Sequence, residues 1–354
     1  MTKNTLGEDK NLILILGNGF DLAHGIPTSY NDFSKYILNK IIVDELITEK
    51  TSLISDNFIL KLKTKSTQHF PENLEYIKLH TAIAKKETQD IIDLLLLNNK
   101  KLLLMSLNNS FLRNLFANNY DNWFDIEHAY FEELLNKFNQ RDRAIQLQLI
   151  IKHNSELNEL KNLLISYLKP LNKQNYHNIR HFDTRFYQNW DNIYIINFNY
   201  TDTIFHYFRE SNEQANTRIN FIHGDLEARA GEIVFGYGND QHKKYNELKE
   251  SKIDECLEFF KTYSYLRKKE YQNVFSEAID VFNNYQVAVL GHSLGETDKT
   301  LLKEIFENDK CKKIHLFKRG DLGHKPEIQL KEHNKLFYAI SRIITKDSTT
   351  RNKV

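Results

Sequence analysis

Five short clusters of polar residues and glycine carry the side chains best suited to chemistry. The first contains Gly17, Asn18, Gly19, Phe20 and Asp21. Glycine lets the backbone approach a phosphate closely, and a helix starting here would point free N–H groups and its positive dipole end at the anion. This favours a nucleotide site, although the spacing is not the full G-x-G-x-x-G fingerprint and an ordinary strand-to-helix turn would use the same residues.

The second and third clusters offer groups that could bind a sugar or move a proton. The amide of Asn199 donates and accepts together, so it could orient a ribose hydroxyl or a water, whereas Thr201 and Asp202 could equally cap the next helix. His223 precedes Gly224. A histidine at a strand end suits general-base work near neutral pH, but it could also be a structural residue.

The fourth and fifth clusters are rich in glycine. Gly236, Gly238, Asn239 and Asp240 suit a ligand loop or a turn. The fifth, GHSLG from 291 to 295, matches the nucleophile elbow of serine hydrolases as a pattern. Only 59 residues follow it to supply an acid and a histidine. The candidates there are Asp298, Asp309 or Asp321 with His315, His324 or His333. A hydrolase using Ser293 also leaves the other clusters without a task, so it is the less favoured alternative.

Short apolar runs precede these clusters and predict the elements that position them. The runs are 11–16, 193–198, 219–222, 233–235, 287–290 and 313–317. Clusters that follow strands lie where an open α/β sheet binds its ligands, at the carboxyl ends of the strands. We therefore expect a Rossmann-like α/β fold with a parallel sheet.

A long segment without strand signals separates the first run from the others. From about 33 to 169 the sequence is helical in period, with Pro71 as its only proline before 170. This predicts an α/β domain built from 1–35 and 186–354, and an α-helical insertion over 36–185. The apolar stretch from Ile91 to Leu107 is broken by Asn98 to Lys101 and is too short to span a membrane, so we expect a bent helix or a helix pair. Pro27 followed by Thr28 and Ser29 is expected to form a rigid turn into the N-cap of the first helix of this segment, with Asp32 in its first turn.

Charge and cysteine content limit the partners. The chain has 354 residues, with 48 Lys and Arg against 47 Asp and Glu, so the net charge of +1 gives no argument for nucleic acid or an anionic membrane as an obligatory partner. Cys256 and Cys311 cannot form a four-thiolate zinc site. No secretory signal is recognisable, so a cytoplasmic protein is expected.

The order of the five clusters resembles that of sirtuin-like NAD-binding domains, and the chain is more closely similar to the bacterial abortive-infection AbiH family. The sirtuin-like matches are Gly17, Gly19, Gly25, Ile26 and Pro27, then Asn199, then His223 and Gly224, then Phe235 and Gly236, and finally Gly291, Ser293 and Leu294. The AbiH hallmarks resemble LGNGFDLAHGIPTSY, NFNYTDT, IHG, FGYGND and GHSLGETD in this chain.

The resemblance also has departures that shape its meaning. The zinc-binding cysteine pairs of protein deacylases are missing between His223 and Phe235, so no zinc is expected. Asn18 and Asp21 stand where sirtuins carry Ala and Ser. The resemblance therefore implies breakdown of NAD in phage defence rather than deacylation.

The leading hypothesis is an NAD glycohydrolase. In it, Asn199 orients ribose or water, His223 acts as general base or ribose partner, and Asp21 stabilises developing positive charge. The residues implied in binding NAD are Gly17, Asn18, Gly19, Phe20, Gly224, Gly236, Gly291, Ser293 and Asp298, the last of which could instead cap a helix. Trp123, Asp125 and Glu127 of the insertion could reach the pocket or simply pack and cap.

Other functions remain open. The same pocket could sense NAD or another nucleotide without catalysis while the insertion engages a partner or a phage-derived trigger. A nuclease effector would give the same defence phenotype, although no nuclease metal motif is recognisable. A homo-oligomer is one way to hold such an effector inactive until infection.

Overall fold

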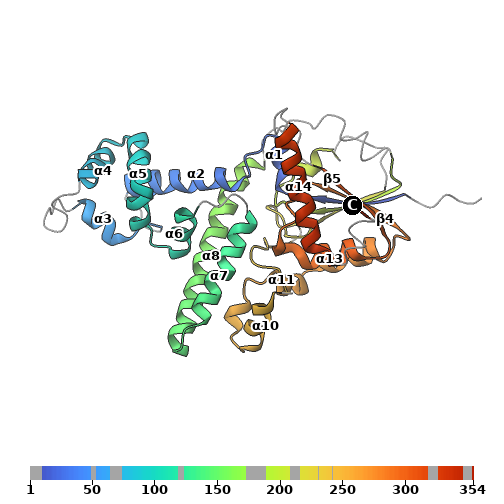
Figure 1. Cartoon of the computed structure of the whole chain (residues 1–354). Helices are drawn as coiled ribbons and strands as arrows, with labels where there is room; N and C mark the ends of the chain where they lie inside the picture. Colours follow the sequence, from blue (N-terminus) through green and yellow to red (C-terminus); the bar gives the residue numbers. More distant parts are fainter. Residues whose placement is uncertain are drawn as a thin grey trace, which may run out of the picture. The chain divides into compact units, whose positions relative to one another are not determined.

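The computed structural model divides the chain into two compact units (Figure 1). The sheet unit comprises Met1–Thr28 and Leu168–Val354, and the helical unit comprises Ser29–Tyr167. The structure describes residues 10–48, 53–63, 74–118, 123–172, 189–207, 216–229, 231–240, 242–317, 326–345 and 353–354.

The sheet unit contains a five-stranded, all-parallel sheet with the strand order β3-β2-β1-β4-β5. Its strands are β1 (Asn11–Leu16), β2 (Asn192–Asn197), β3 (Asn216–Phe221), β4 (Tyr285–Leu290) and β5 (Cys311–Phe317). This confirms the expected α/β class with a parallel sheet. The chain crosses from β3 over to β4 on the other side of β1, so a topological switch point lies between β1 and β4, where open α/β sheets bind ligands.

One predicted strand is wrong. Residues 233–235 form no strand but part of a loop, in which the Val234 N–H donates to the carbonyl of His223 at 2.8 Å. Val234 and Phe235 are 4% and 5% exposed. Their apolar character therefore reflects burial of a loop against the core, which short runs cannot reveal because a buried loop and a buried strand have the same composition.

Each face of the sheet is covered by its own apolar cluster. Ile13, Ile15 and Val289 point to the face that also packs Leu302 and Ile340. The opposite face carries Leu12, Leu14 and Leu16 with Phe20 and Ile204. Alternation along β1 thus places successive residues in two different cores, as a strand buried on both sides requires.

The remaining elements of the sheet unit are short helices and one long terminal helix. They are α1 (Asn18–Ala23), η2 (Thr203–Tyr207), α10 (Lys243–Glu250), η3 (Asp254–Leu257), α11 (Lys261–Arg267), α12 (Lys269–Val274), η4 (Phe275–Ile279), η5 (Glu296–Asp298), α13 (Lys299–Glu307) and α14 (Pro326–Ile343).

The helical unit confirms that the stretch between β1 and β2 is α-helical. Its elements are α2 (Tyr30–Lys40), η1 (Ile41–Ile47), α3 (Asp56–Lys63), α4 (Leu74–Lys85), α5 (Thr88–Ser106), α6 (Ser110–Ala117), α7 (Trp123–Phe138) and α8 (Arg143–Leu171), the last of which ends in the sheet unit. Helix α5 is interrupted by non-helical backbone at 97–100, which agrees with the bent helix or helix pair expected there. The Ser29 side chain caps α2 by accepting the Asp32 N–H at 3.1 Å.

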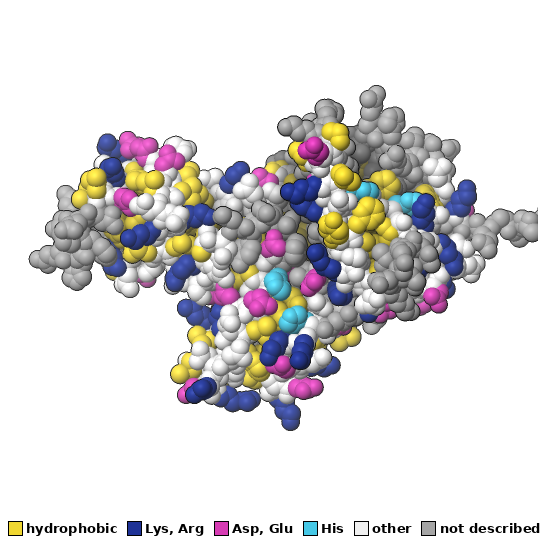
Figure 2. All heavy atoms as spheres, viewed as in Figure 1, with side chains coloured by type: hydrophobic (Ala, Val, Ile, Leu, Met, Phe, Trp, Pro, Cys, Tyr) yellow, Lys and Arg dark blue, Asp and Glu magenta, His cyan; other side chains and the backbone are white. Residues whose placement is uncertain are grey.

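Aromatic packing fills the interior of the helical unit. The ring of Trp123 lies 5.4 Å from that of Phe33 and 5.9 Å from that of Tyr30, so this residue has a packing role. His153 stacks on Tyr130 at 4.7 Å. None of the described helices is long and apolar enough to cross a membrane. Acidic and basic side chains are interspersed on the face seen in Figure 2, in keeping with the even charge balance.

Candidate functional site

The loops that follow β1, β2 and β4 are hydrogen-bonded to one another at the carboxyl edge of the sheet. Asn199 Nδ2 donates to the carbonyl of Gly17 at 3.0 Å, and the Gly19 N–H donates to the carbonyl of Gly291 at 2.8 Å. The register explains this meeting, because Leu16 pairs with Asn197 on one side and Leu290 on the other. The structure thus brings the first, second and fifth sequence clusters together.

The glycines of the first and fifth clusters allow two backbones to cross. A Cβ on Gly17 would lie 2.5 Å from the Cα of His292, and one on Gly291 would lie 2.2 Å from the backbone nitrogen of Phe20. Gly291 also has a φ of +69°. The Gly19 and Phe20 N–H groups already donate to carbonyls of Gly291 and Gly17. Close packing therefore explains these glycines without a phosphate, and the predicted phosphate cradle remains a prediction.

Asp21 ties the turn after β1 to the loop after β2. Its carboxyl accepts from Thr201 Oγ1 at 2.6 Å and from Asn199 Nδ2 at 3.3 Å, and the residue is 2% exposed. Burial raises the pKa of Asp21 to about 6, against the opposing effect of its hydrogen bonds from Thr201 and Thr203. The hydroxyl of Thr201 serves this contact rather than the cap considered from the sequence.

The two chain segments that lead from the sheet unit into the helical unit and back are hydrogen-bonded to the loops after β1 and β2. Thr28 Oγ1, at the end of the first sheet-unit segment, donates to Asn18 Oδ1 at 2.5 Å. Asn172 follows α8 and accepts the Asp202 N–H on its side-chain oxygen at 2.6 Å. The segments that lead into and out of the helical unit are therefore anchored to the loops after β1 and β2.

A buried cluster of charged and titratable side chains joins the third and fifth sequence clusters. Asp298 Oδ1 lies 2.8 Å from the ammonium of Lys261 and 3.2 Å from Nε2 of His223. Its Oδ2 faces Nε2 of His292 at 3.6 Å. Lys261 is 1% exposed and Asp298 9%. We call these four residues the Asp298 cluster.

Electrostatics within the Asp298 cluster keep the carboxylate ionised and His223 neutral. Burial alone would raise the pKa of Asp298, but Lys261 and then His223 outweigh it and hold this pKa well below its usual value. Burial, followed by the charge of Lys261, lowers the pKa of His223 to about 4 although Asp298 acts the other way. His223 is thus a weaker base than the near-neutral one expected from the sequence.

Aromatic rings surround the two imidazoles. The ring of Phe198 lies 5.1 Å from that of His223 and 4.3 Å from that of His292. The Tyr265 hydroxyl is 2.9 Å from His223 Nε2, and its ring is nearly parallel to the imidazole. These contacts fix the position of both histidine rings.

The glycine-rich loop of the fourth cluster positions Lys261. The Tyr237 N–H donates to the carbonyl of Phe259 at 3.0 Å, and the Lys261 N–H donates to the carbonyl of Tyr237 at 2.8 Å. A Cβ on Gly236 would lie 2.0 Å from the Phe259 oxygen. Gly236 therefore permits the close approach that places the start of α11 beside Asp298.

The structure defines the conformation or exposure of three candidate residues from the sequence. Asp298 stands at the N-cap position of α13, yet its side chain makes no capping hydrogen bond, so the cap alternative is wrong. Gly224 has a φ of +77°, which gives it a backbone role. Ser293 is exposed.

The environment of Ser293 gives no support to a nucleophile elbow. Gly291 and Leu294, on either side of Ser293, have a positive φ, whereas Ser293 itself does not. The Leu294 N–H donates to His292 Nδ1 at 3.0 Å, so this neighbouring imidazole is engaged elsewhere. Of the histidines considered as its partner, His315 bonds Gln286 and His333 packs on Phe337, while His324 lies outside the described residues.

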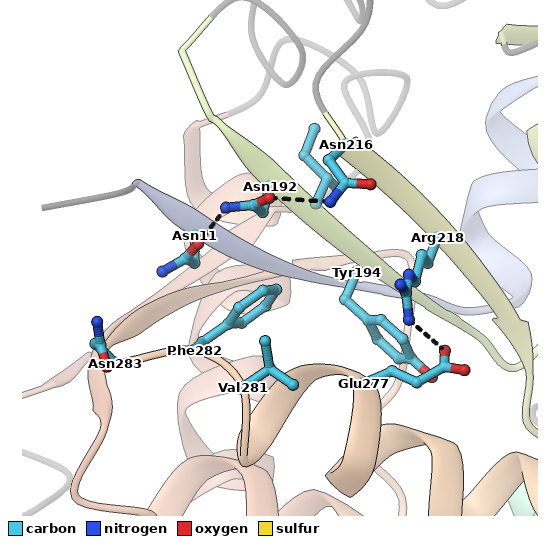
Figure 3. A pocket seen from close by; sticks show the side chains of 10 residues that line it. Asn11, Asn192, Tyr194, Asn216, Arg218, Glu277, Val281, Phe282 and Asn283 are labelled. Atoms are coloured by element: carbon cyan, nitrogen blue, oxygen red, sulfur yellow. Dashed lines mark hydrogen bonds and ion pairs between the residues drawn. The ribbon is translucent and has the colours of Figure 1, made fainter.

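The opposite, amino edge of the sheet carries a pocket of about 240 Å³ (Figure 3). Asn11, Asn192 and Asn216 occupy equivalent positions on three neighbouring strands and form a chain of amide hydrogen bonds. Arg218 and Glu277 lie side by side at one end of the pocket and form an ion pair at 3.7 Å (Figure 3). None of the residues proposed from the sequence for the site lines it.

Sequence reasoning missed Lys261, His292 and Tyr265. His292 stood in the fifth cluster, but its pattern drew attention to the serine beside it. Lys261 lies in none of the clusters and is one of 48 basic residues, so the sequence held no signal for it. Among the described residues, no three His, Cys, Asp or Glu side chains gather in a way that could hold a metal ion.

Comparison with known proteins identifies the family. No curated protein matches the chain. The family model for bacteriophage abortive infection AbiH matches residues 13–318, a span that begins within β1 and includes the helical unit and the other four strands. The chain therefore belongs to the AbiH family of phage abortive-infection defence proteins.

Proposed function

We propose that this AbiH protein acts in abortive infection by hydrolysing NAD at the nicotinamide–ribose bond. The observation that carries the proposal is the buried Asp298 cluster, which contributes a neutral imidazole and an ion pair at the carboxyl edge near the β1–β4 switch point. The order of the sequence motifs, which resembles that of sirtuin-like NAD-binding domains, supports NAD as the substrate.

The reaction requires positioning of water more than a strong base. Departure of neutral nicotinamide leaves an oxocarbenium-like ribose carbon, which water attacks with loss of one proton. The balanced products are nicotinamide, ADP-ribose and that proton. His223 accepts the proton, and Asp298 at 3.2 Å stabilises the imidazolium formed. Asn199 holds the ribose or the water with its amide, which Asp21 orients.

A direct assay tests this proposal. Full-length protein, purified from cells with and without phage infection, is incubated with NAD while nicotinamide and ADP-ribose are followed by chromatography. We expect release by the wild type, loss of at least about 10²-fold in His223→Ala and Asn199→Ala, and no change in His333→Ala on α14. Circular dichroism checks that each variant is folded.

Intact NAD after incubation with both wild-type preparations would overturn the hydrolase. Calorimetric binding of that intact NAD, lost in Asn199→Ala, would then favour the sensing module. This second function has its own support, because the N–H groups of Gly19 and Phe20 and the carboxyl of Asp21 are already bonded within the protein. A carboxyl bonded in this way holds the loops after β1 and β2 together instead of acting on a substrate, which is compatible with a site that binds without catalysis.

A further inference from the structure

The hydrogen bonds around His292 determine which of its ring nitrogens carries the proton. The backbone N–H of Leu294 donates to Nδ1 at 3.0 Å, so Nδ1 must present its lone pair. A neutral imidazole then carries its hydrogen on Nε2. This N–H faces the carboxylate of Asp298, whose Oδ2 is 3.6 Å away.

The same reasoning applies to His223. Asp298 Oδ1 receives the ammonium of Lys261 at 2.8 Å, which keeps the carboxylate ionised and therefore able only to accept. His223 Nε2 lies 3.2 Å from that oxygen, where an N–H is attracted by the carboxylate and a lone pair would be repelled by it, so the contact favours a proton on Nε2. The Tyr265 oxygen, 2.9 Å from the same nitrogen, is then an acceptor as well.

From this geometry we infer that Asp298, held ionised by Lys261, fixes His223 as the Nε2–H tautomer and leaves Nδ1 as its reactive atom. Asp298 and Lys261 are thus positioning residues that act through His223. The tautomer follows from the contacts alone. Only the statement that Nδ1 accepts a proton from the attacking water rests on the proposed function.

Lys261 and Asp298 have separable tasks. Lys261 prevents the buried carboxyl from taking up a proton, since a protonated carboxyl could donate and would no longer demand a donor from His223. Asp298 in turn selects between the two neutral forms of the imidazole. Loss of either residue should therefore allow both neutral tautomers of His223, even if the ring stays in place against Phe198 and Tyr265.

Nuclear magnetic resonance of the full chain labelled with ¹⁵N-histidine tests the tautomer directly. Long-range ¹H–¹⁵N spectra at neutral pH distinguish the two ring nitrogens, and comparison with His223→Gln and His292→Gln assigns the signals. We expect both histidines in the Nε2–H form in the wild type. We expect His223 to become a mixture in Asp298→Asn and in Lys261→Met.

Two further variants keep this test decisive. Tyr265→Phe retains the ring and removes the hydroxyl, and it should leave His223 in the Nε2–H form. Asp298→Glu keeps a carboxylate and covers the case in which Asp298→Asn does not fold. An Nδ1–H signal for His223 in the wild type would overturn the inference. So would a mixture in Tyr265→Phe alone, because the hydroxyl would then be setting the tautomer.

Activity separates this inference from the proposed function. If NAD is hydrolysed, Asp298→Asn should lower kcat by about 10²–10⁴-fold with little change in KM. His223→Asn, whose amide can replace Nδ1, should retain more activity than His223→Gln, whose amide replaces Nε2. The reverse order would contradict the role of Nδ1. If NAD is not hydrolysed, the spectra still decide the tautomer while the assay alone refutes the hydrolase.

Discussion

The two edges of the sheet both carry polar side chains, but they treat charge differently. At the carboxyl edge, Lys261 and Asp298 form an ion pair in which the lysine side chain is 1% exposed. At the amino edge, Arg218 and Glu277 lie 3.7 Å apart with the arginine side chain 56% exposed. Residue type alone does not separate the two edges. The two ion pairs differ in burial, and a buried charge destabilises the protein strongly when its partner is removed.

Removing the buried cation should have the largest effect. Lys261→Met keeps most of the side-chain volume but leaves Asp298 without its cation, so we expect a loss of about 3–5 kcal/mol in the free energy of unfolding at pH 8. The matched change at the other edge, Arg218→Met, should cost less than about 1 kcal/mol. Urea unfolding followed by circular dichroism measures both.

The pH dependence of the Lys261→Met loss provides an internal check. Without Lys261, the pKa of Asp298 rises because the lysine charge that opposed the effect of burial is gone. A carboxyl that takes up a proton no longer carries an unpaired buried charge, so the loss should be smaller at pH 5 than at pH 8. Equal losses for Lys261→Met and Arg218→Met would remove the distinction between the edges.

Adding a methyl group where the backbones cross should have the next largest effect. Gly291→Ala combines a φ of +69° with a contact of 2.2 Å to the backbone of Phe20, and we expect a loss of about 2–5 kcal/mol. Gly231→Ala is the control, because Gly231 has a similar φ of +80° but only the flexible end of Lys268 nearby, at 3.6 Å. It should cost about 1–2 kcal/mol. Thermal unfolding at one pH compares the two, and similar losses would mean that φ strain alone matters.

Titration of the carboxyl edge should give a smaller and graded effect. The pKa of His223 is about 4 in the folded protein and 6.5 when unfolded, so between these values the unfolded state binds more protons and stability falls as pH falls. Asp21 acts oppositely, because its folded pKa of about 6 exceeds the unfolded 3.8 and stability rises as pH falls through 6. Each contribution is limited to about 1.4 kcal/mol per pH unit.

Difference curves isolate the two groups. Free energies of unfolding are measured by urea from pH 4 to 7.5 for the wild type, His223→Gln and Asp21→Asn. Subtracting the wild type should give slopes of opposite sign for the two variants. The control is His128→Gln, an exposed position on α7. Slopes of the same sign would show that one of the two groups is less perturbed than its burial indicates.

Much of the fold could be predicted because parallel strands leave a simple signal. Five of the six apolar runs form strands, and each of these runs is followed by a break in the apolar pattern. The run at 233–235 failed because three apolar residues in a buried loop look the same. The meeting of the clusters also followed from the sequence, because parallel strands end at one edge.

The chemistry of the site was less predictable for two physical reasons. Absence of a side chain at Gly17 and Gly291 serves a phosphate or a crossing backbone equally well, and only the structure shows the crossing. An isolated β-bridge between Tyr237 and Phe260 holds Lys261 close enough to donate to Asp298. This bridge joins residues far apart in the sequence and follows no periodic pattern. Local spacing cannot encode such a contact.

The anchoring of both inter-unit connections has a mechanical consequence. Thr28 is bonded to Asn18, and Asn172 to Asp202, so the chain leaves and re-enters the sheet unit at residues that touch the loops after β1 and β2. We therefore expect a displacement of either connecting segment to be felt first in the loops that hold Asp21 and Asn199. The covalent chain itself connects the helical unit to the loops of the site, and this connection does not depend on an interface between the units.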